Sequence, residues 1–93
     1  MDKVSRAVLK CQKIMLYLAK EGYTKQVTKQ KLREAIDWTV GIDDRTFQKY
    51  LNAMKRLKFI REVGNGIFEL NYVKIPGAIE ILLKRGDNQK KLM

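Results

Sequence analysis

Residues 43–57 read DDRTFQKYLNAMKRL, and this stretch has the strongest helix signal in the chain. At about 100° per residue, its apolar side chains fall on one side of a helix. They are Phe47, Tyr50, Leu51, Met54 and Leu57. Asp43 stands just before them, and its carboxylate can accept hydrogen bonds from the first free backbone amides. We therefore predict a helix that begins after Asp43, runs to about Leu57 and packs its apolar side on a core.

The opposite side of this helix is polar and basic. Its stripe follows spacings of four, three and four residues, and consists of Arg45, Lys49, Asn52 and Arg56. The flanks of the stripe are Thr46, Gln48, Ala53 and Lys55. Residues 45–58 include five basic residues and no acidic one, whereas residues 59–93 include six basic and four acidic residues. The positive charge is therefore local, although a simple solvated helix face has the same pattern.

Two helices are predicted before this one. In residues 4–20 the apolar positions recur at intervals of three and four, and Gly22 follows as a terminator. Thr28 can cap a short helix over residues 29–36, whose apolar stripe is Leu32, Ala35 and Ile36. Residues 37–42 then break the period. Trp38 lies in this break, and we expect it to close the core there.

The period changes to two after the basic helix. Residues 59–63 and 67–72 are predicted strands of a hairpin around Gly64-Asn65-Gly66. A two-residue turn would place Glu62 opposite Glu69, and two like charges in that position destabilise a sheet. A three-residue loop is therefore favoured. It sets Ile60 opposite Leu70 and Arg61 opposite Glu69, and it gathers on one face Ile60, Phe68, Leu70 and Tyr72.

Pro76 can open a short fourth helix that ends before Gly86. The expected fold class is mainly α with a small β-hairpin (α+β), in the order ααα-ββ-α. Residues 1–86 form one domain, and residues 87–93 form a polar tail.

The composition excludes most enzyme chemistry. The 93 residues include 20 Lys and Arg against 10 Asp and Glu, no His and one Cys, with a formal net charge of +10. A zinc site, an internal disulfide and a serine–histidine pair cannot be built, so we expect no catalytic residue, no metal and no cofactor. The longest apolar run, residues 14–19, is too short to span a bilayer, and the amino terminus lacks a signal-peptide pattern. A cytoplasmic location is expected.

The segment from Val40-Gly41-Ile42-Asp43 through Thr46-Phe47 to Leu51, with the apolar residues that follow it, resembles the winged helix-turn-helix proteins. The likeness covers residues 28–72. The size, the basicity and the compact wing look most like those of small archaeal plasmid and virus proteins of this family, including the AspA type of partition-site binding protein. Lys58 is a departure, because such proteins often have glycine at that position.

The resemblance implies a DNA-binding surface on three segments. On the basic helix it implies contacts from Arg45, Thr46, Gln48, Lys49, Asn52, Lys55 and Arg56. At the start of the second helix it implies a phosphate contact from Thr28, Lys29 and Lys31. The hairpin tip at Asn65 could approach the backbone or the minor groove, while Arg61 is expected to pair with Glu69. Arg, Lys, Asn and Gln are the side chains that read base edges in the major groove.

A homodimer is expected, because the first helix carries Leu9, Leu16 and Tyr17 outside its main stripe. The fourth helix and tail are a rival dimer surface. Cys11 could form a disulfide across the twofold axis or remain a buried thiol. A twofold dimer would bind palindromic double-stranded DNA with its two reading helices about 34 Å apart. Two roles fit: a plasmid-partition adaptor that works with a partition protein or ATPase, or an autoregulatory transcriptional repressor. In the alternative, the basic face of a protein-interaction winged helix binds an acidic partner.

Overall fold

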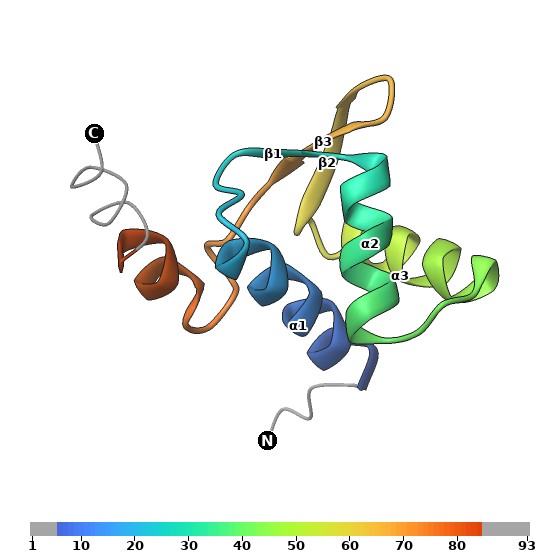
Figure 1. Ribbon diagram of the computed structural model, residues 1–93, viewed down its shortest axis with the longest axis horizontal. Coiled ribbons are helices and arrows are strands. Elements are labelled where there is room, and N and C mark those ends of the chain that lie inside the picture. The colour runs from blue at the N-terminus through green and yellow to red at the C-terminus, as the bar shows by residue number, and fades with distance from the viewer. Residues whose placement is uncertain (1–5, 85–93) are drawn as a thin grey trace.

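The computed structural model describes residues 6–84 (Figure 1). The elements follow the order α1 (Arg6–Lys20), β1 (Gln26–Thr28), α2 (Lys29–Thr39), α3 (Asp44–Arg56), β2 (Ile60–Gly64) and β3 (Ile67–Leu70). Residues 78–84 form a further helical segment. The described part of the chain is thus a mixed α+β fold, with four helices and one three-stranded antiparallel sheet. The predicted tail, residues 87–93, lies outside the described residues.

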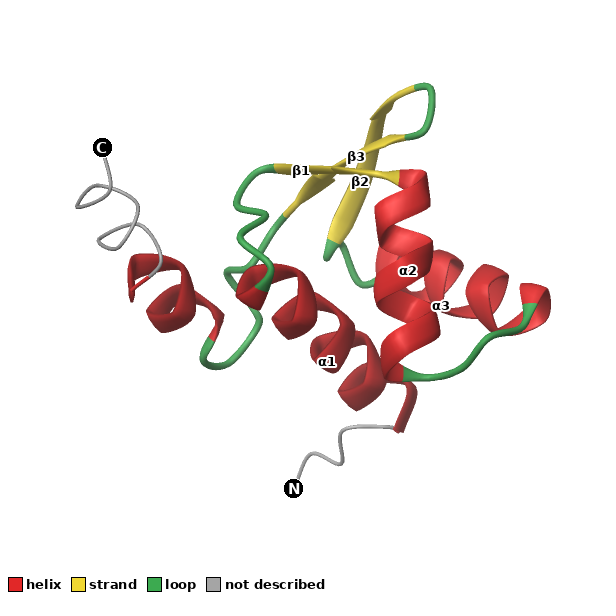
Figure 2. Ribbon diagram, in the orientation of Figure 1, coloured by secondary structure: helices red, strands yellow, loops and turns green. Residues whose placement is uncertain are grey.

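The core lies between the first three helices and one face of the sheet. α1, α2 and α3 contact one another, and the helical segment 78–84 lies on the other side of α1 from α2 in the view of Figure 2. The apolar side of α3 is buried as predicted, with Phe47, Tyr50, Leu51 and Met54 in the core. Leu57 packs against the core and is partly buried.

The sheet has a third strand that the sequence pattern did not predict. β1 pairs antiparallel with β3, which places Val27 opposite Phe68, and the strand order is β1-β3-β2. β1 has three residues and only its middle one, Val27, is buried. Three residues are too few for a period of two to be visible, and the partner strand is about forty residues away in the chain. The predicted order ααα-ββ-α is therefore corrected by a strand between α1 and α2.

The prediction that the second helix ends at Ile36 is also wrong. α2 continues to Thr39, whose hydroxyl donates to the carbonyl oxygen of Ala35 at 2.7 Å. Each further helical residue turns by about 100°, so Trp38 points about 200° away from the buried Ile36. Trp38 is 76% exposed, and the expectation that it closes the core is wrong.

The hairpin has the predicted register with a different turn. Ile60 lies opposite Leu70 and Arg61 opposite Glu69, as predicted. The tip is nevertheless a two-residue turn, because Gly64 pairs with Ile67, and an irregularity between Glu62 and Gly64 absorbs one residue. This bulge keeps Glu62 away from Glu69, so the like-charge contact is avoided by a bulge in place of a longer loop. The predicted inner face is buried and consists of Ile60, Phe68, Leu70 and Tyr72.

Replacing Trp38 should test its position on the surface. We expect Trp38→Ala to change the free energy of unfolding by less than about 0.5 kcal/mol, as for other exposed sites. Met54→Ala is the matched core variant, because Met54 is 0% exposed, and it should cost about 2–5 kcal/mol. Urea unfolding of both variants measures the difference. If Trp38→Ala lowered the free energy of unfolding about as much as Met54→Ala, Trp38 would have to be a core residue.

Candidate nucleic-acid interface

The amino end of α3 is held by two acidic residues. Asp43 caps the helix, because its carboxylate accepts from the backbone amide of Arg45 at 2.9 Å. Asp44 forms an ion pair with Arg33 of α2, whose guanidinium also lies 5.2 Å from the centre of the Phe47 ring. The hydrogen bond to Asp44 raises the pKa of Arg33. The Arg33 side chain thus joins α2 to the first turn of α3.

The carboxyl end of α3 is closed by backbone hydrogen bonds. The amide of Lys58 donates to the carbonyl oxygen of Lys55 at 3.1 Å, and that of Phe59 donates to Met54 at 2.9 Å. This pair of bonds defines a Schellman cap, in which the residue after the cap is left-handed. Lys58 has that conformation, with φ at 65°. The chain then enters β2 directly, so both ends of α3 are tied to the rest of the fold.

The four residues of the predicted stripe all lie on the exposed side of α3. Arg45, Lys49, Asn52 and Arg56 are exposed, and no acidic side chain of α3 lies beyond Asp44. Within residues 6–84, neither Arg45 nor Arg56 forms an ion pair with an acidic residue. The stripe therefore presents uncompensated positive charge to solvent.

Three of the four residues that flank this stripe have polar side chains. Gln48 is exposed and donates from Nε2 to Oδ1 of Asn52 at 3.4 Å, one helical turn away, so the two amides are aligned. Thr46 is partly buried. Lys55 is exposed, but its ammonium lies 3.5 Å from the carboxylate of Glu62 on β2. The charge of Lys55 is thus partly compensated by the hairpin.

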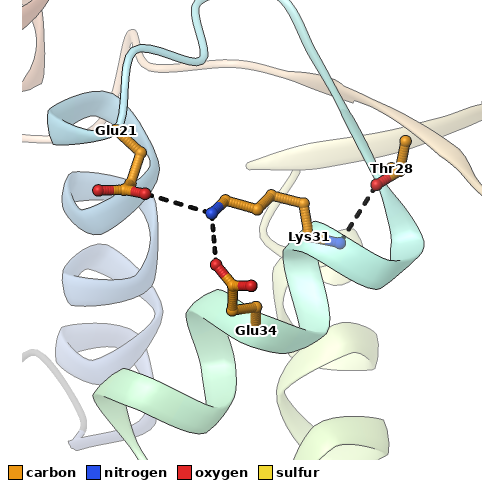
Figure 3. A network of polar contacts seen from close by, with 4 residues as sticks. All are labelled: Glu21, Thr28, Lys31 and Glu34. Carbon is orange, nitrogen blue, oxygen red and sulfur yellow. Dashed lines mark hydrogen bonds and ion pairs between the residues drawn. The ribbon is translucent and has the colours of Figure 1, made fainter.

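The side chains at the start of α2 form more contacts within the protein than the sequence indicated. The Thr28 hydroxyl caps α2 by accepting from the amide of Lys31 at 3.2 Å, and the Lys31 ammonium lies between the carboxylates of Glu21 and Glu34 (Figure 3). The contact with Glu34 raises the pKa of Lys31, with Glu21 adding to it. The Lys31 side chain therefore joins the end of α1 to α2, and its charge is compensated. Lys31 and Glu21 are ten residues apart, so their contact could not be predicted from local spacing in the sequence.

The hairpin tip meets the start of α2. The amide of Lys29 donates to the carbonyl oxygen of Gly66 at 2.7 Å, so this amide is already bonded and is not free for a ligand. The exposed side chains of Lys29 and Asn65 therefore lie at two adjoining elements. The tip extends beyond the amino end of α2 (Figure 1). The fold thus brings the start of α2 and the hairpin tip next to each other.

Comparisons with protein-family models, with curated proteins and with solved structures give no match to this chain. Within residues 6–84, every helix is too short or too polar to cross a bilayer.

The cap of α3 can be tested separately from its charge. Asp43→Ala removes the acceptor for the Arg45 amide and should lower the free energy of unfolding by about 1 kcal/mol. Asp43→Asn keeps a capping oxygen without the charge and should retain most of the stability. Urea unfolding of the two variants makes the comparison. Equal losses in both would assign the effect to the charge of Asp43, and no loss in either would show that the cap is unimportant.

Proposed function

We propose that this chain is a sequence-specific double-stranded DNA-binding protein, and that α3 is the reading helix of a winged helix-turn-helix module. The observation that carries the proposal is the exposed stripe Arg45, Lys49, Asn52 and Arg56, which lies opposite the buried side of the same helix. A major groove about 12 Å wide admits one α-helix, and side chains of these types recognise its base edges. α2, α3 and the β2–β3 hairpin follow one another in the order that such a module needs.

The residues of α3 divide into two roles in this proposal. Arg45, Lys49 and Arg56 donate to guanine edges or to phosphates, according to their depth in the groove. Asn52 and Gln48 suit adenine, which an amide side chain can contact through two hydrogen bonds. The two side chains stand next to each other on this face, since Nε2 of Gln48 donates to Oδ1 of Asn52 at 3.4 Å. Thr46, at the edge of the stripe, is assigned to the phosphate backbone, and Lys55 would join it by exchanging its 3.5 Å contact with Glu62 for a phosphate.

A second contact is proposed at the start of α2 and the hairpin tip. Lys29 and Asn65 are exposed on adjoining elements, and both can reach the phosphate backbone beside the groove. Thr28 serves this contact by capping α2. Lys31 is left out of the proposed interface, because Glu21 and Glu34 already bind its ammonium.

The same proposal includes a homodimer on palindromic sites. Leu9 of α1 is 47% exposed and borders a surface groove with Leu16, which supports α1 as the dimer surface. Ile79 and Leu83 in the helical segment 78–84 are 50% and 65% exposed and support the rival surface. Cys11 is fully buried within one copy, and burial raises the pKa of its thiol to about 11. These properties favour an inert thiol over a disulfide between subunits.

Two cellular roles follow from dimeric binding to one site. The protein could mark a plasmid-partition site for an adaptor or ATPase, or it could cover its own promoter as a repressor. Both roles act on cytoplasmic DNA. An acidic protein partner would use the same basic stripe of α3, and direct binding measurements with duplex DNA and with acidic proteins separate the two alternatives.

Duplex binding with a steep salt dependence is the main expected result. We expect a fluorescent duplex with the palindrome upstream of the gene to bind, with log affinity falling against log salt by about 0.9 for each phosphate contacted. Fluorescence anisotropy at several salt concentrations measures the slope. Failure to bind any duplex at low salt, together with binding to acidic proteins, would replace DNA with the protein partner.

Base reading and phosphate binding should separate in single variants. Asn52→Ala should lower discrimination between the palindrome and a scrambled duplex by about 1–3 kcal/mol. Lys29→Ala should weaken binding to both duplexes alike and reduce the salt slope by about 1. The matched measurement is anisotropy of each variant on both duplexes. Equal losses on both duplexes for Asn52→Ala would remove its assignment as a base-reading residue.

The dimer surface can be identified by introducing one charged residue into each of the two candidate surfaces, α1 and the helical segment 78–84. Leu9→Glu and Leu83→Glu each place a carboxylate on an exposed apolar site, so neither should disturb the core. We expect one of the two to convert the dimer to a monomer in analytical ultracentrifugation, and the other to leave it intact. A wild-type protein that sediments as a monomer at every concentration would remove the dimer from the proposal.

A further inference from the structure

Lys58 has a backbone conformation that favours glycine. It is the only residue other than glycine with a positive φ among residues 6–84, and its φ is 65°. The position follows directly on α3 in the Schellman cap, where a side chain brings Cβ close to the backbone. Asn71, which follows β3, contacts the same turn: its side-chain amide donates to the carbonyl oxygen of Lys58 at 3.4 Å, and its backbone amide donates to that of Phe59 at 2.9 Å.

The Lys58 side chain contributes no contact that would explain its presence. It is exposed, and within the described part of the chain it forms no ion pair, no side-chain hydrogen bond and no ring contact. A positive charge does favour the carboxyl end of a helix. Lys55 and Arg56 already supply two such charges in the last turn of α3. A glycine at position 58 would therefore suit the fold better than lysine does.

Lys58 lines a surface groove of about 360 Å³ between the end of α3 and the hairpin. Two other cations line it, and each faces an acidic partner. Lys55 lies 3.5 Å from Glu62, and Arg61 donates to Glu69 at 2.8 Å. Among the cations of this groove, Lys58 is the one without a carboxylate partner in residues 6–84. Glu69 also lines the groove, and its carboxylate is the partner of Arg61, so Lys58 supplies the one positive charge of this lining that has no acidic partner in residues 6–84.

We propose that this groove is a phosphate site, with Lys58 as its binding residue, and that it holds a backbone phosphate of the duplex whose groove α3 enters. A strained residue that the surrounding structure holds in place is typical of functional sites. Lys58 directly follows the last turn of α3. When α3 lies in the major groove, the Lys58 ammonium can therefore reach the DNA backbone beside the stripe. This inference rests on the proposed function, and it adds a contact at the opposite end of α3 from Arg45.

The test compares stability and DNA affinity at one position. Lys58→Gly relieves the backbone and removes the charge, so we expect its urea midpoint to rise while its affinity for the palindromic duplex falls about 3- to 10-fold. The slope of log affinity against log salt should fall by about 1. Lys58→Asn, which also tolerates this conformation without charge, should lose a similar affinity, and Lys58→Arg should bind as the wild type does. Lys74→Ala, an exposed lysine outside the groove, is the control and should bind normally.

The outcomes separate this inference from the proposed function. If the wild type binds duplex DNA and Lys58→Gly binds equally well with the same salt slope, the phosphate site is wrong and the DNA-binding proposal stands. If Lys58→Gly has a lower urea midpoint, the lysine serves the fold and the inference is overturned. If the wild type binds no duplex, both proposals fail. A more stable Lys58→Gly protein with weaker binding, restored in Lys58→Arg, supports the site.

Discussion

The burial of one side of α3 is the constraint on which the rest of the structure depends. Phe47, Tyr50, Leu51 and Met54 are buried in the core shared with α1, α2 and the sheet, and each buried side chain of this size stabilises the fold by about 1.5–3 kcal/mol. A helix cannot rotate without exposing these residues. The opposite side, with its four polar and basic residues, must therefore face solvent. Core packing and the presentation of charge are two results of the same helical period.

Contacts at the two ends of α3 add to this constraint on its rotation, because they join the helix to α2 and to β2. The Arg33–Asp44 pair joins the first turn of α3 to α2, Asp43 caps that turn, and the Schellman cap at Lys58 turns the chain toward β2. The basic side chains fall into two groups, those with an acidic partner and those without one among the described residues. Lys31 and Arg61 are tied to acidic partners and serve the fold, while the stripe on α3 has cations without such partners among the described residues. Net charge alone could not distinguish these two groups, since both consist of the same side chains.

Features with a local cause were predictable from the sequence, and features with a distant cause were not. The apolar side of α3, the Asp43 cap and the pairing of Ile60 with Leu70 follow from spacing, capping chemistry and like-charge repulsion, and the structure confirms them. β1 depends on pairing with β3, and the compensation of Lys31 depends on Glu21, so neither leaves a local pattern. The exposure of Trp38 was missed because α2 continues three residues beyond Ile36 and turns the indole outward. The stripe itself was visible in the sequence, while its use in DNA binding stays a proposal.

The most direct test of the central claim is an NMR titration of the ¹⁵N-labelled protein with duplex DNA, followed by amide chemical shifts. The account predicts that the largest shifts lie in residues 45–58, with a second group at residues 28–30 and 64–66. Amides of the buried side of α3 should move less than those of the stripe. Shifts confined to α1 or to the exposed residues around Trp38, with α3 unchanged, would contradict the claim that α3 enters the groove.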